Sequence, residues 1–170
     1  MIAALKELEM NQLNVQTRVA TVEDIELIYG FILQKAEFDG YPNELEATPE
    51  KLRQTLFCQP PLATVLFAEV DGVAVGFALF GYSYSSFLAQ LTLWLGDLFV
   101  QSHSRGQGVG TALLIHLAHI AEKTDCGRIE WTVAVNNSLG ISFYEKQGAR
   151  ILETKLCRVN RALIAQTLGR

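Results

Sequence analysis

Apolar positions recur with helical spacing in two stretches of the first third of the chain. Ile25–Ala36 keeps the spacing of one helix face, behind a short strand at Arg18–Ala20. A second helix is predicted from the start signal Thr48-Pro49-Glu50 to about Cys58, shortly before a Pro-Pro pair. The residues between the two helices, Glu37–Glu44, predict an acidic loop rich in turn formers.

The middle of the chain predicts a β-hairpin. Thr64–Val70 and Val73–Tyr82 are runs of β-forming residues, and the two-residue signal Asp71-Gly72 between them favours a tight turn. We expect a polar and aromatic loop at Tyr82–Phe87 before the chain returns as a further strand.

The next strand, Leu91–Val100, leads through a glycine-rich turn into a long amphipathic helix. Gly96 interrupts the strand, which indicates a bulge or a close approach of another backbone. The helix is predicted to begin at about Gly108, to reach Thr124 and to be terminated by Gly127.

The last third predicts a strand, a short helix and a final strand. They cover Arg128–Val135, Ser138–Gln147 with Gly148 as its terminator, and Ile151–Val159. A hairpin followed by strand–helix–strand units is typical of an α/β fold with a mixed sheet, antiparallel first and then joined by crossovers.

Composition limits the class of protein. The chain has 170 residues, 49% of them hydrophobic, and 14 − 18 = −4 formal charges. This length suits one domain with a single core, which we place at residues 17–170 behind an N-terminal leader of residues 1–16. A negative net charge without a basic run argues against a nucleic-acid binder. No apolar stretch approaches the ~20 residues of a membrane span.

The cysteines and histidines indicate neither a disulfide framework nor a metal site. Cys58, Cys126 and Cys157 are far apart and lack C-x-x-C spacing, which favours reduced, mostly buried thiols and a cytoplasmic location. The three histidines lack the paired spacing of zinc ligands, so we expect no metal and interpret them as packing or surface residues.

The segment Leu98–Thr111 combines the end of a strand, a tight turn and the start of a helix. Gly106, Gly108 and Gly110 let successive backbone N–H groups face one concavity, where the helix dipole adds partial positive charge. Such a concavity is a cradle for an anion such as a pyrophosphate. It lacks the G-K-[ST] ending of a P-loop and departs from the G-x-G-x-x-G of a dinucleotide site, although Glu130 lies roughly 20 residues further on.

Two motifs in this order resemble the GNAT family of acyltransferases, which bind acetyl-coenzyme A (acetyl-CoA). Arg105-x-x-Gly108-x-Gly110 has the [QR]-x-x-G-x-[GA] signature, and Asn137 followed by Phe143–Ala149 is similar to the N-x(6)-Y…G-A element. Within the family the chain most resembles the diamine (spermidine/spermine and thialysine) N-acetyltransferases, through Leu95–Val100 and Cys126–Trp131.

The resemblance implies a strongly twisted mixed sheet, flanked by helices, with a splayed pair of parallel strands that admits acetyl-CoA. It also implies that Tyr144 is the general acid, because a phenol with a pKa near 10 stays protonated at neutral pH and can donate to a leaving thiolate. The residues expected to bind the cofactor are Leu98, Phe99, Val100, Arg105, Gly106, Gln107, Gly108, Val109, Gly110, Thr111, Asn137 and Tyr144.

The acceptor amine also needs a group that takes its proton. The diamine acetyltransferases carry Glu-Asp on this strand, whereas this chain has Gly96-Asp97, so Asp97 is the remaining carboxylate for the base or for orienting the substrate. By the same resemblance Glu37 lies on the substrate side, and Asp39 is near it in sequence. We expect Glu37, Asp39 and Asp97 to bind a cationic acceptor.

These expectations lead to transfer of an acetyl group from acetyl-CoA to a primary amine of a small molecule, a diamine, polyamine or basic amino acid, by direct attack. Two alternatives remain: a protein or peptide N-acetyltransferase, and an acyl-CoA-binding sensor domain, which the missing glutamate at Gly96 favours. A nucleotide-dependent oxidoreductase ranks below both. Because the family commonly forms dimers, we expect a homodimer, for which the apolar, aromatic stretch Phe80–Leu95 is a candidate surface.

Overall fold

The computed structural model describes residues 14–168, which fall into two compact units. The first unit ends at Thr132 and the second begins at Val133. Most of the predicted leader lies outside the described residues. The first strand already begins at Val15, earlier than the predicted Arg18, because five residues rather than three find partners in the sheet.

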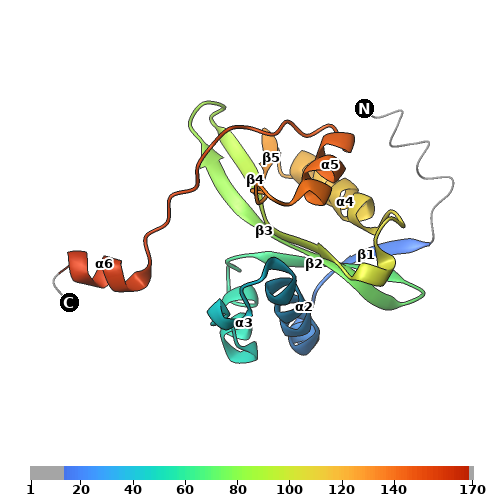
Figure 1. Ribbon diagram of the computed structural model, residues 1–170, viewed down its shortest axis with the longest axis horizontal. Coiled ribbons are helices and arrows are strands. Elements are labelled where there is room, and N and C mark those ends of the chain that lie inside the picture. Colours follow the sequence, from blue (N-terminus) through green and yellow to red (C-terminus); the bar gives the residue numbers. More distant parts are fainter. Residues whose placement is uncertain (1–13, 169–170) are drawn as a thin grey trace. The chain divides into compact units, whose positions relative to one another are not determined.

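The first unit is built on a five-stranded sheet in the order β1-β2-β3-β4-β5 (Figure 1). The first four strands pair antiparallel and β5 runs parallel to β4, which confirms the predicted α/β fold with a mixed sheet. The strands are β1 (Val15–Val19), β2 (Thr64–Val70), β3 (Val73–Ser85), β4 (Gln90–Val100) and β5 (Arg128–Glu130). The helices are α2 (Ile25–Asp39), α3 (Pro49–Leu56) and α4 (Val109–Lys123), with 3-10 turns η1 (Val22–Asp24), η2 (Pro42–Glu44) and η3 (Ser102–Ser104).

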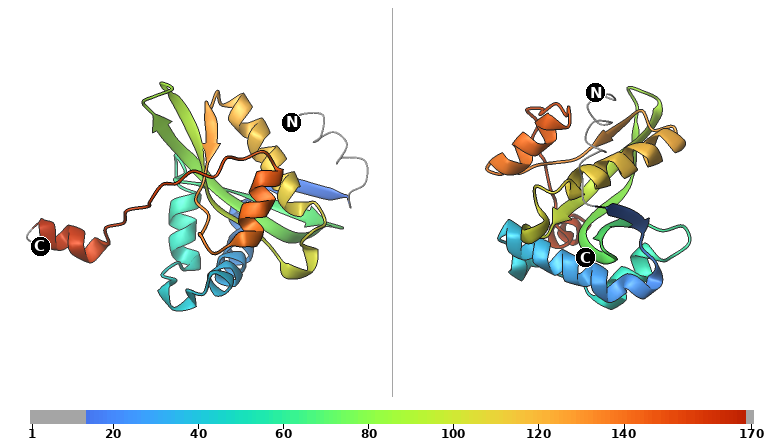
Figure 2. Two further views of the ribbon diagram at one scale, coloured as in Figure 1. Left: turned by 45° about the horizontal axis from the view of Figure 1, so that its top comes forward. Right: turned by 90° about the vertical axis from the view of Figure 1, so that its right-hand side faces the viewer.

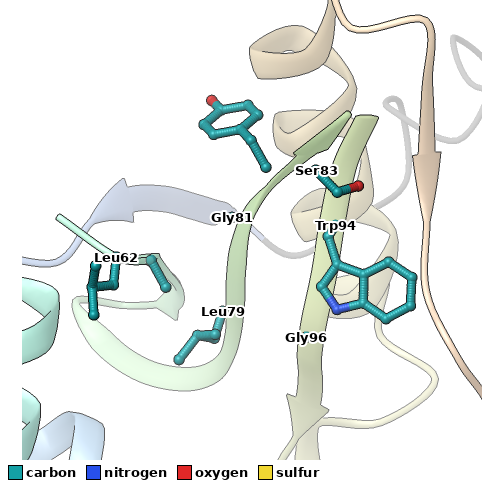
Figure 3. Close-up of a pocket in the computed structure, with 8 residues that line it drawn as sticks. Leu62, Leu79, Gly81, Ser83, Trp94 and Gly96 are labelled. Carbon is teal, nitrogen blue, oxygen red and sulfur yellow. The ribbon is translucent and has the colours of Figure 1, made fainter. Parts of the chain in front are cut away.

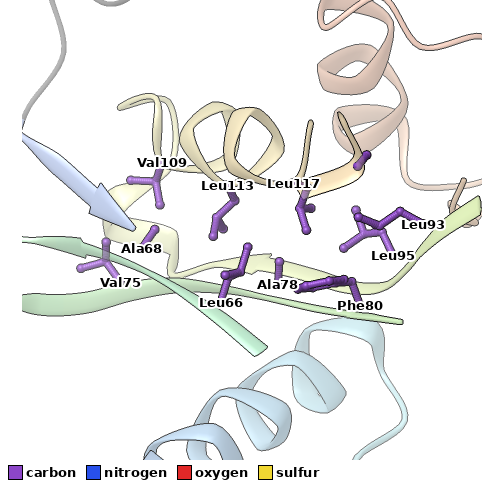
Figure 4. Close-up of a cluster of buried hydrophobic side chains, with 11 residues drawn as sticks. Leu66, Ala68, Val75, Ala78, Phe80, Leu93, Leu95, Val109, Leu113 and Leu117 are labelled. Carbon is purple, nitrogen blue, oxygen red and sulfur yellow. The ribbon is translucent and has the colours of Figure 1, made fainter. Parts of the chain in front are cut away.

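Helices cover both faces of this sheet, α4 on one side and α2 with α3 on the other (Figures 1 and 2). We call these sides the α4 face and the α2 face. The core on the α4 face is mainly aliphatic (Figure 4) and consists of Leu66, Ala68, Val75, Ala78, Phe80, Leu93, Leu95, Val109, Leu113, Leu117 and Ala121. The core on the α2 face is aromatic: the Phe31 ring lies 5.7, 5.5 and 6.4 Å, centroid to centroid, from Phe67, Phe77 and Phe99.

Local signals in the sequence set the ends of several elements. Asp71 and Gly72 both have left-handed backbone conformations, with φ of 52° and 76°, as the predicted two-residue hairpin requires. The Thr48 side chain caps α3 by accepting a hydrogen bond from the Lys51 backbone N–H at 3.2 Å. These signals act over two to four residues, so they are legible without tertiary structure.

The predicted irregularity at Gly96 is a β-bulge. Leu79 of β3 pairs with Asp97, and the next residue, Phe80, pairs with Leu95, so Gly96 has no residue opposite it on β3. One extra residue in a strand shifts the alternation of side chains between the two faces by one position. The bulge therefore decides which residues of β4 face α2 and which face α4.

The second unit contains two helices, α5 (Ser138–Lys146) and α6 (Arg161–Thr167). The first confirms the prediction, including its left-handed terminator Gly148 with φ of 88°. The sequence analysis did not predict α6, although the Asn160 side chain caps it by accepting from the Leu163 N–H at 2.9 Å. The strand predicted at Ile151–Val159 is wrong, since these residues are irregular and find no partner strand among the described residues.

Two predicted loops are shorter than expected. Tyr82–Ser85 belongs to β3, because these residues pair with Gln90–Leu93 of β4 and leave only the hairpin tip as a loop. The acidic stretch begins within α2, which continues to Asp39 and ends at the left-handed Gly40. Glu37 and Asp39 are therefore helical residues.

Two predicted ends also differ. The helix α4 ends at Lys123, where Asp125 rather than Gly127 adopts the left-handed conformation, with φ of 53°. The strand β5 ends at Glu130 instead of Val135, since it pairs with β4 only as far as Trp94, just before the bulge.

The cysteines partly follow the expectation from composition. All three thiols are free; Cys58 and Cys126 are half-buried, but Cys157 is exposed, so the expectation of mostly buried thiols is wrong for that residue. Within residues 14–168 no helix has the length and apolar character needed to cross a membrane.

Candidate active site

The turn between β4 and α4 has the backbone conformation that an anion cradle needs. Gly106 and Gly108 have φ of 75° and 84°, which glycine adopts without the strain that a side chain would cause. A Cβ built on Gly106 meets no atom within 4 Å, so the turn borders open space. Gly108 is the N-cap of α4, and the first amides of a helix have no acceptor within it. These residues therefore fit a pyrophosphate.

The start of α4 is fixed by close packing against the sheet. Val109 is 1% exposed and belongs to the core of the α4 face. A Cβ on Gly76 of β3 would lie 3.0 Å from Val109 Cγ1 and 3.1 Å from the Phe99 carbonyl oxygen, so a side chain there would push α4 away from the sheet by a few tenths of an ångström. The sequence analysis missed Gly76, since this contact joins residues that are far apart in the chain.

The second half of β4 has an open edge. β5 pairs with Thr92–Trp94 only, and in the described part of the chain no strand pairs with Gly96–Val100 on that side. Leu98, Phe99 and Val100, predicted to bind the cofactor, therefore lie along an edge that no strand of the described chain covers, although the Val100 carbonyl accepts from the Arg105 side chain. The remaining predicted cradle residues follow directly in the turn and the first turn of α4: Arg105, Gly106, Gln107, Gly108, Val109, Gly110 and Thr111.

The side chain of Arg105 is held against aromatic rings. Its guanidinium carbon lies 4.4 Å from the centroid of Phe38 and 5.7 Å from that of Phe99, and its Nε donates to the Val100 carbonyl at 2.9 Å. Gln107 Nε2 donates to the His103 carbonyl at 3.0 Å. Both side chains thus stabilise the turn itself, and their contribution to cofactor binding stays a prediction.

The bulge brings Asp97 to the α2 face. Leu95 packs on the α4 face, but after Gly96 the alternation is shifted, and Phe99 packs on the α2 face. Asp97 lies on that same face, with Oδ1 3.0 Å from Lys35 Nζ. Without the bulge this carboxylate would point toward the aliphatic core.

Lys35 joins two of the three predicted acceptor-side carboxylates. Its Nζ also donates to Asp39, one helical turn further along α2. Burial lowers the pKa of Lys35, but the hydrogen bonds and charges of Asp39 and Asp97 raise it more, so the net shift is upward and the ammonium form is favoured. Glu37 is exposed and lies between Lys35 and Asp39 in sequence, hence on another side of the helix.

A cavity of about 310 Å³ adjoins the bulge (Figure 3). It is on the α2 face, since Leu79 packs against the aromatic core there. Asp97 is not one of its lining residues, but it follows the lining residue Gly96 in β4 and pairs with Leu79 across the sheet. The size suits a small molecule. Its lining is Leu62, Ala63, Leu79, Gly81, Tyr82, Ser83, Trp94 and Gly96.

The second unit carries the other two predicted residues. Asn137 is the N-cap of α5, where its Oδ1 accepts from the Gly140 N–H at 2.9 Å. Tyr144 lies one and a half turns into α5, is 9% exposed, and its ring centroid is 5.2 Å from that of Phe143. The roles of Asn137 and Tyr144 toward the cofactor stay predictions.

Comparison with known proteins agrees with this architecture. The sequence profile described as Acetyltransferase (GNAT) family matches residues 31–149. L-ornithine N5-acetyltransferase of Arabidopsis thaliana is 30% identical over 84% of this chain and 82% of its own length. Thialysine N-epsilon-acetyltransferase of Mus musculus is 27% identical, over 79% of this chain and 84% of its own. An integron cassette protein of V. cholerae shares the fold, with a TM-score of 0.75, 23% identity and coverage of 93% of this chain and 99% of that one.

The mixed sheet, whose parallel pair β4–β5 is short, and the glycine turn at the start of α4 agree with the fold of the similar structure. With the profile match over more than two thirds of its length, the chain belongs to the GNAT family of acetyl-CoA-dependent N-acetyltransferases.

Proposed function

We propose that this protein transfers the acetyl group of acetyl-CoA to a primary amine of a small molecule, a diamine, a polyamine or a basic amino acid, by direct attack of the amine. The observation that carries the proposal is the juxtaposition at β4. The open edge of the strand leads into the glycine cradle, while Asp97 and the cavity lie at the bulge of the same strand.

The cofactor side uses backbone groups. The amides from Gly106 to Thr111 hold the pyrophosphate, and the open edge at Leu98–Val100 pairs with the extended arm of the cofactor. Asn137 supports that arm through its carboxamide. When bound, acetyl-CoA supplies a thioester that an uncharged amine can attack.

Two side chains move protons in the proposed reaction. Asp97 accepts a proton from the incoming ammonium, directly or through water, so that the amine becomes nucleophilic. Tyr144 holds a proton on its phenolic oxygen and donates it to the sulfur as the C–S bond breaks. The nitrogen that has formed the new C–N bond releases its second proton, which restores the phenol directly or through water. Asp39 and Glu37 attract the cationic acceptor to the α2 face. The similar proteins named for ornithine and thialysine act on small amines, which supports this acceptor class.

The proposal is tested by calorimetric titration with acetyl-CoA and by a thiol-release assay with diamines, polyamines and basic amino acids. We expect Tyr144→Phe to lower kcat by about 10²-fold or more while the Kd for acetyl-CoA stays unchanged. Tyr41→Phe removes the same hydroxyl from an exposed tyrosine outside the proposed dimer surface and serves as the control. A chain without affinity for CoA contradicts the function, and full turnover by Tyr144→Phe contradicts the role of the phenol.

We further propose a cytoplasmic homodimer. Aromatic residues at the end of the β3–β4 hairpin support it, since Tyr82, Tyr84 and Phe87 are all exposed, Phe87 at 96%. Light scattering of the purified protein at several concentrations tests the oligomeric state. A monomer at every concentration contradicts the dimer.

A further inference from the structure

The acceptor side of the proposed site holds cations as well as carboxylates. Asp39 and Asp97 share one ammonium, that of Lys35, and the three groups together carry one negative charge. A second cation, Arg105, is stacked on Phe38, the residue next to Asp39. The carboxylates are therefore not free to receive a cationic acceptor without Lys35 beside it.

Lys35 is well placed to contact an acceptor. Its side chain is 24% exposed and that of Asp97 28% exposed, so both are reached from solvent while most of their surface is covered. A lysine ammonium has three N–H donors, and the contacts with Asp39 and Asp97 account for two of them. The third can donate to an acceptor group that carries negative charge.

We propose that Lys35 determines acceptor specificity: its ammonium disfavours diamines and favours acceptors that carry a carboxylate, such as basic amino acids. This inference rests on the proposed function and narrows its acceptor class. When a diamine brings one amine to Asp97, its second amine is also positively charged. That second amine is repelled by Lys35 and forms no hydrogen bond with it. An amino acid of the same length places a carboxylate there and gains a charge-assisted hydrogen bond.

The test compares two acceptors that differ by a single carboxylate, ornithine and 1,4-diaminobutane. The value of kcat/KM for each is measured with the unmodified protein and with Lys35→Met, Lys35→Arg and Lys123→Met. Lys35→Met keeps the length and apolar stem of the side chain, Lys35→Arg keeps its charge, and Lys123→Met removes a charge from an exposed lysine at the end of α4.

We expect Lys35→Met to shift the ratio of kcat/KM by about tenfold toward 1,4-diaminobutane, which corresponds to roughly 1.4 kcal/mol. Lys35→Arg should keep the ratio within about twofold, because it retains a positive charge beside Asp39 and Asp97. Lys123→Met should do the same, because the charge that it removes lies at the end of α4 and not in this cluster. Dissociation constants of the two acceptors, measured by calorimetry with the CoA-loaded protein, should shift in the same direction independently of turnover.

A ratio that Lys35→Met leaves within twofold overturns the inference, as does an equal shift in Lys123→Met. Failure of the proposed function gives a different result, because the unmodified protein would then bind CoA without acetylating any amine, or would not bind it. A thermal melt of each variant identifies a loss of folding.

Discussion

The two faces of the sheet differ in chemistry although the same strands supply both. The α4 face is an aliphatic core whose last element, the start of α4, holds a cradle made of backbone amides. The α2 face is an aromatic core bordered by ionised side chains, Lys35, Asp39 and Asp97. In the proposed function the first face binds through main chain and the second through side chains.

The bulge in β4 explains how one strand supplies side chains of different chemistry to the two faces. In a regular strand every second side chain of β4 would face α4 along its whole length. The bulge at Gly96 shifts this alternation by one position in the residues that follow it. Gly96 itself is crowded, because a Cβ there would lie 3.3 Å from Leu79 Cδ2. A side chain at this position requires a shift of a few tenths of an ångström at the flexible end of Leu79, so this contact does not by itself account for the glycine.

Substitutions in the two cores should have the largest effects, and the loss in the free energy of unfolding should be similar on both faces. Phe31→Ala empties the centre of the α2 face and Leu113→Ala that of the α4 face; both residues are almost fully buried. We expect losses of about 3–5 and 2–5 kcal/mol in the free energy of unfolding, measured by urea denaturation. Val135→Ala, at a site 97% exposed, should change it by less than about 0.5 kcal/mol. A tolerant Phe31→Ala would mean that the aromatic core does not hold α2.

A substitution at the proposed proton acceptor on the α2 face should lower turnover without weakening the binding of acetyl-CoA. Asp97→Asn removes the proposed proton acceptor but keeps the size of the side chain and leaves Lys35 paired with Asp39. We expect kcat/KM for the amine to fall by about 10²-fold, with an unchanged Kd for acetyl-CoA. The opposite outcome, intact turnover, would assign Asp97 to the ion pair alone.

A substitution in the glycine turn before α4 should instead weaken the binding of acetyl-CoA. Gly108→Ala puts a side chain on a residue with φ of 84°, which costs about 1–2 kcal/mol or shifts the turn. We expect about a tenfold weaker Kd for acetyl-CoA by calorimetry. Gly30→Ala on α2 is the matched control, since a Cβ there meets no atom within 4 Å and alanine favours helix. Equal loss of affinity in both variants would contradict the cradle.

The smallest expected effect is a pH dependence near the α2 face. Hydrogen bonds from Arg18, at 2.7 and 2.9 Å, lower the pKa of Asp24 to about 2, below its value in an unfolded chain. A depressed pKa stabilises the fold above the unfolded value, so this contribution is present above about pH 4 and is lost as the pH falls toward 2. We expect Asp24→Asn to remove about 1 kcal/mol of stability at pH 7, a modest loss because the pair is partly exposed. At pH 2, where about half of the carboxyls are protonated, the loss should be much smaller, as measured by urea denaturation at both pH values.

Features that depend on neighbouring residues were predicted correctly from the sequence, whereas strand pairing between distant residues was not. The hairpin at Asp71-Gly72, the cap at Thr48 and the glycine conformations before α4 each depend on neighbouring residues, and the structure has them as predicted. The strand predicted at Ile151–Val159 has the right residue types, but a strand also requires a partner, which composition does not supply. For the same reason the predicted end of β5 at Val135 is wrong, since the strand pairs with β4 only as far as Glu130.

The candidate site also combines features that depend on neighbouring residues with contacts between residues far apart in the sequence. The order strand, glycine turn, helix could be predicted from the residues alone, because glycine permits the left-handed conformations that Gly106 and Gly108 adopt in this turn. Only the tertiary structure decided that Gly76 admits α4 to the sheet, that Glu37 is turned away from Asp39, and that Lys35 lies between Asp39 and Asp97. Lys35 and Asp97 are 62 positions apart in the sequence, and a one-residue bulge sets the face on which they meet.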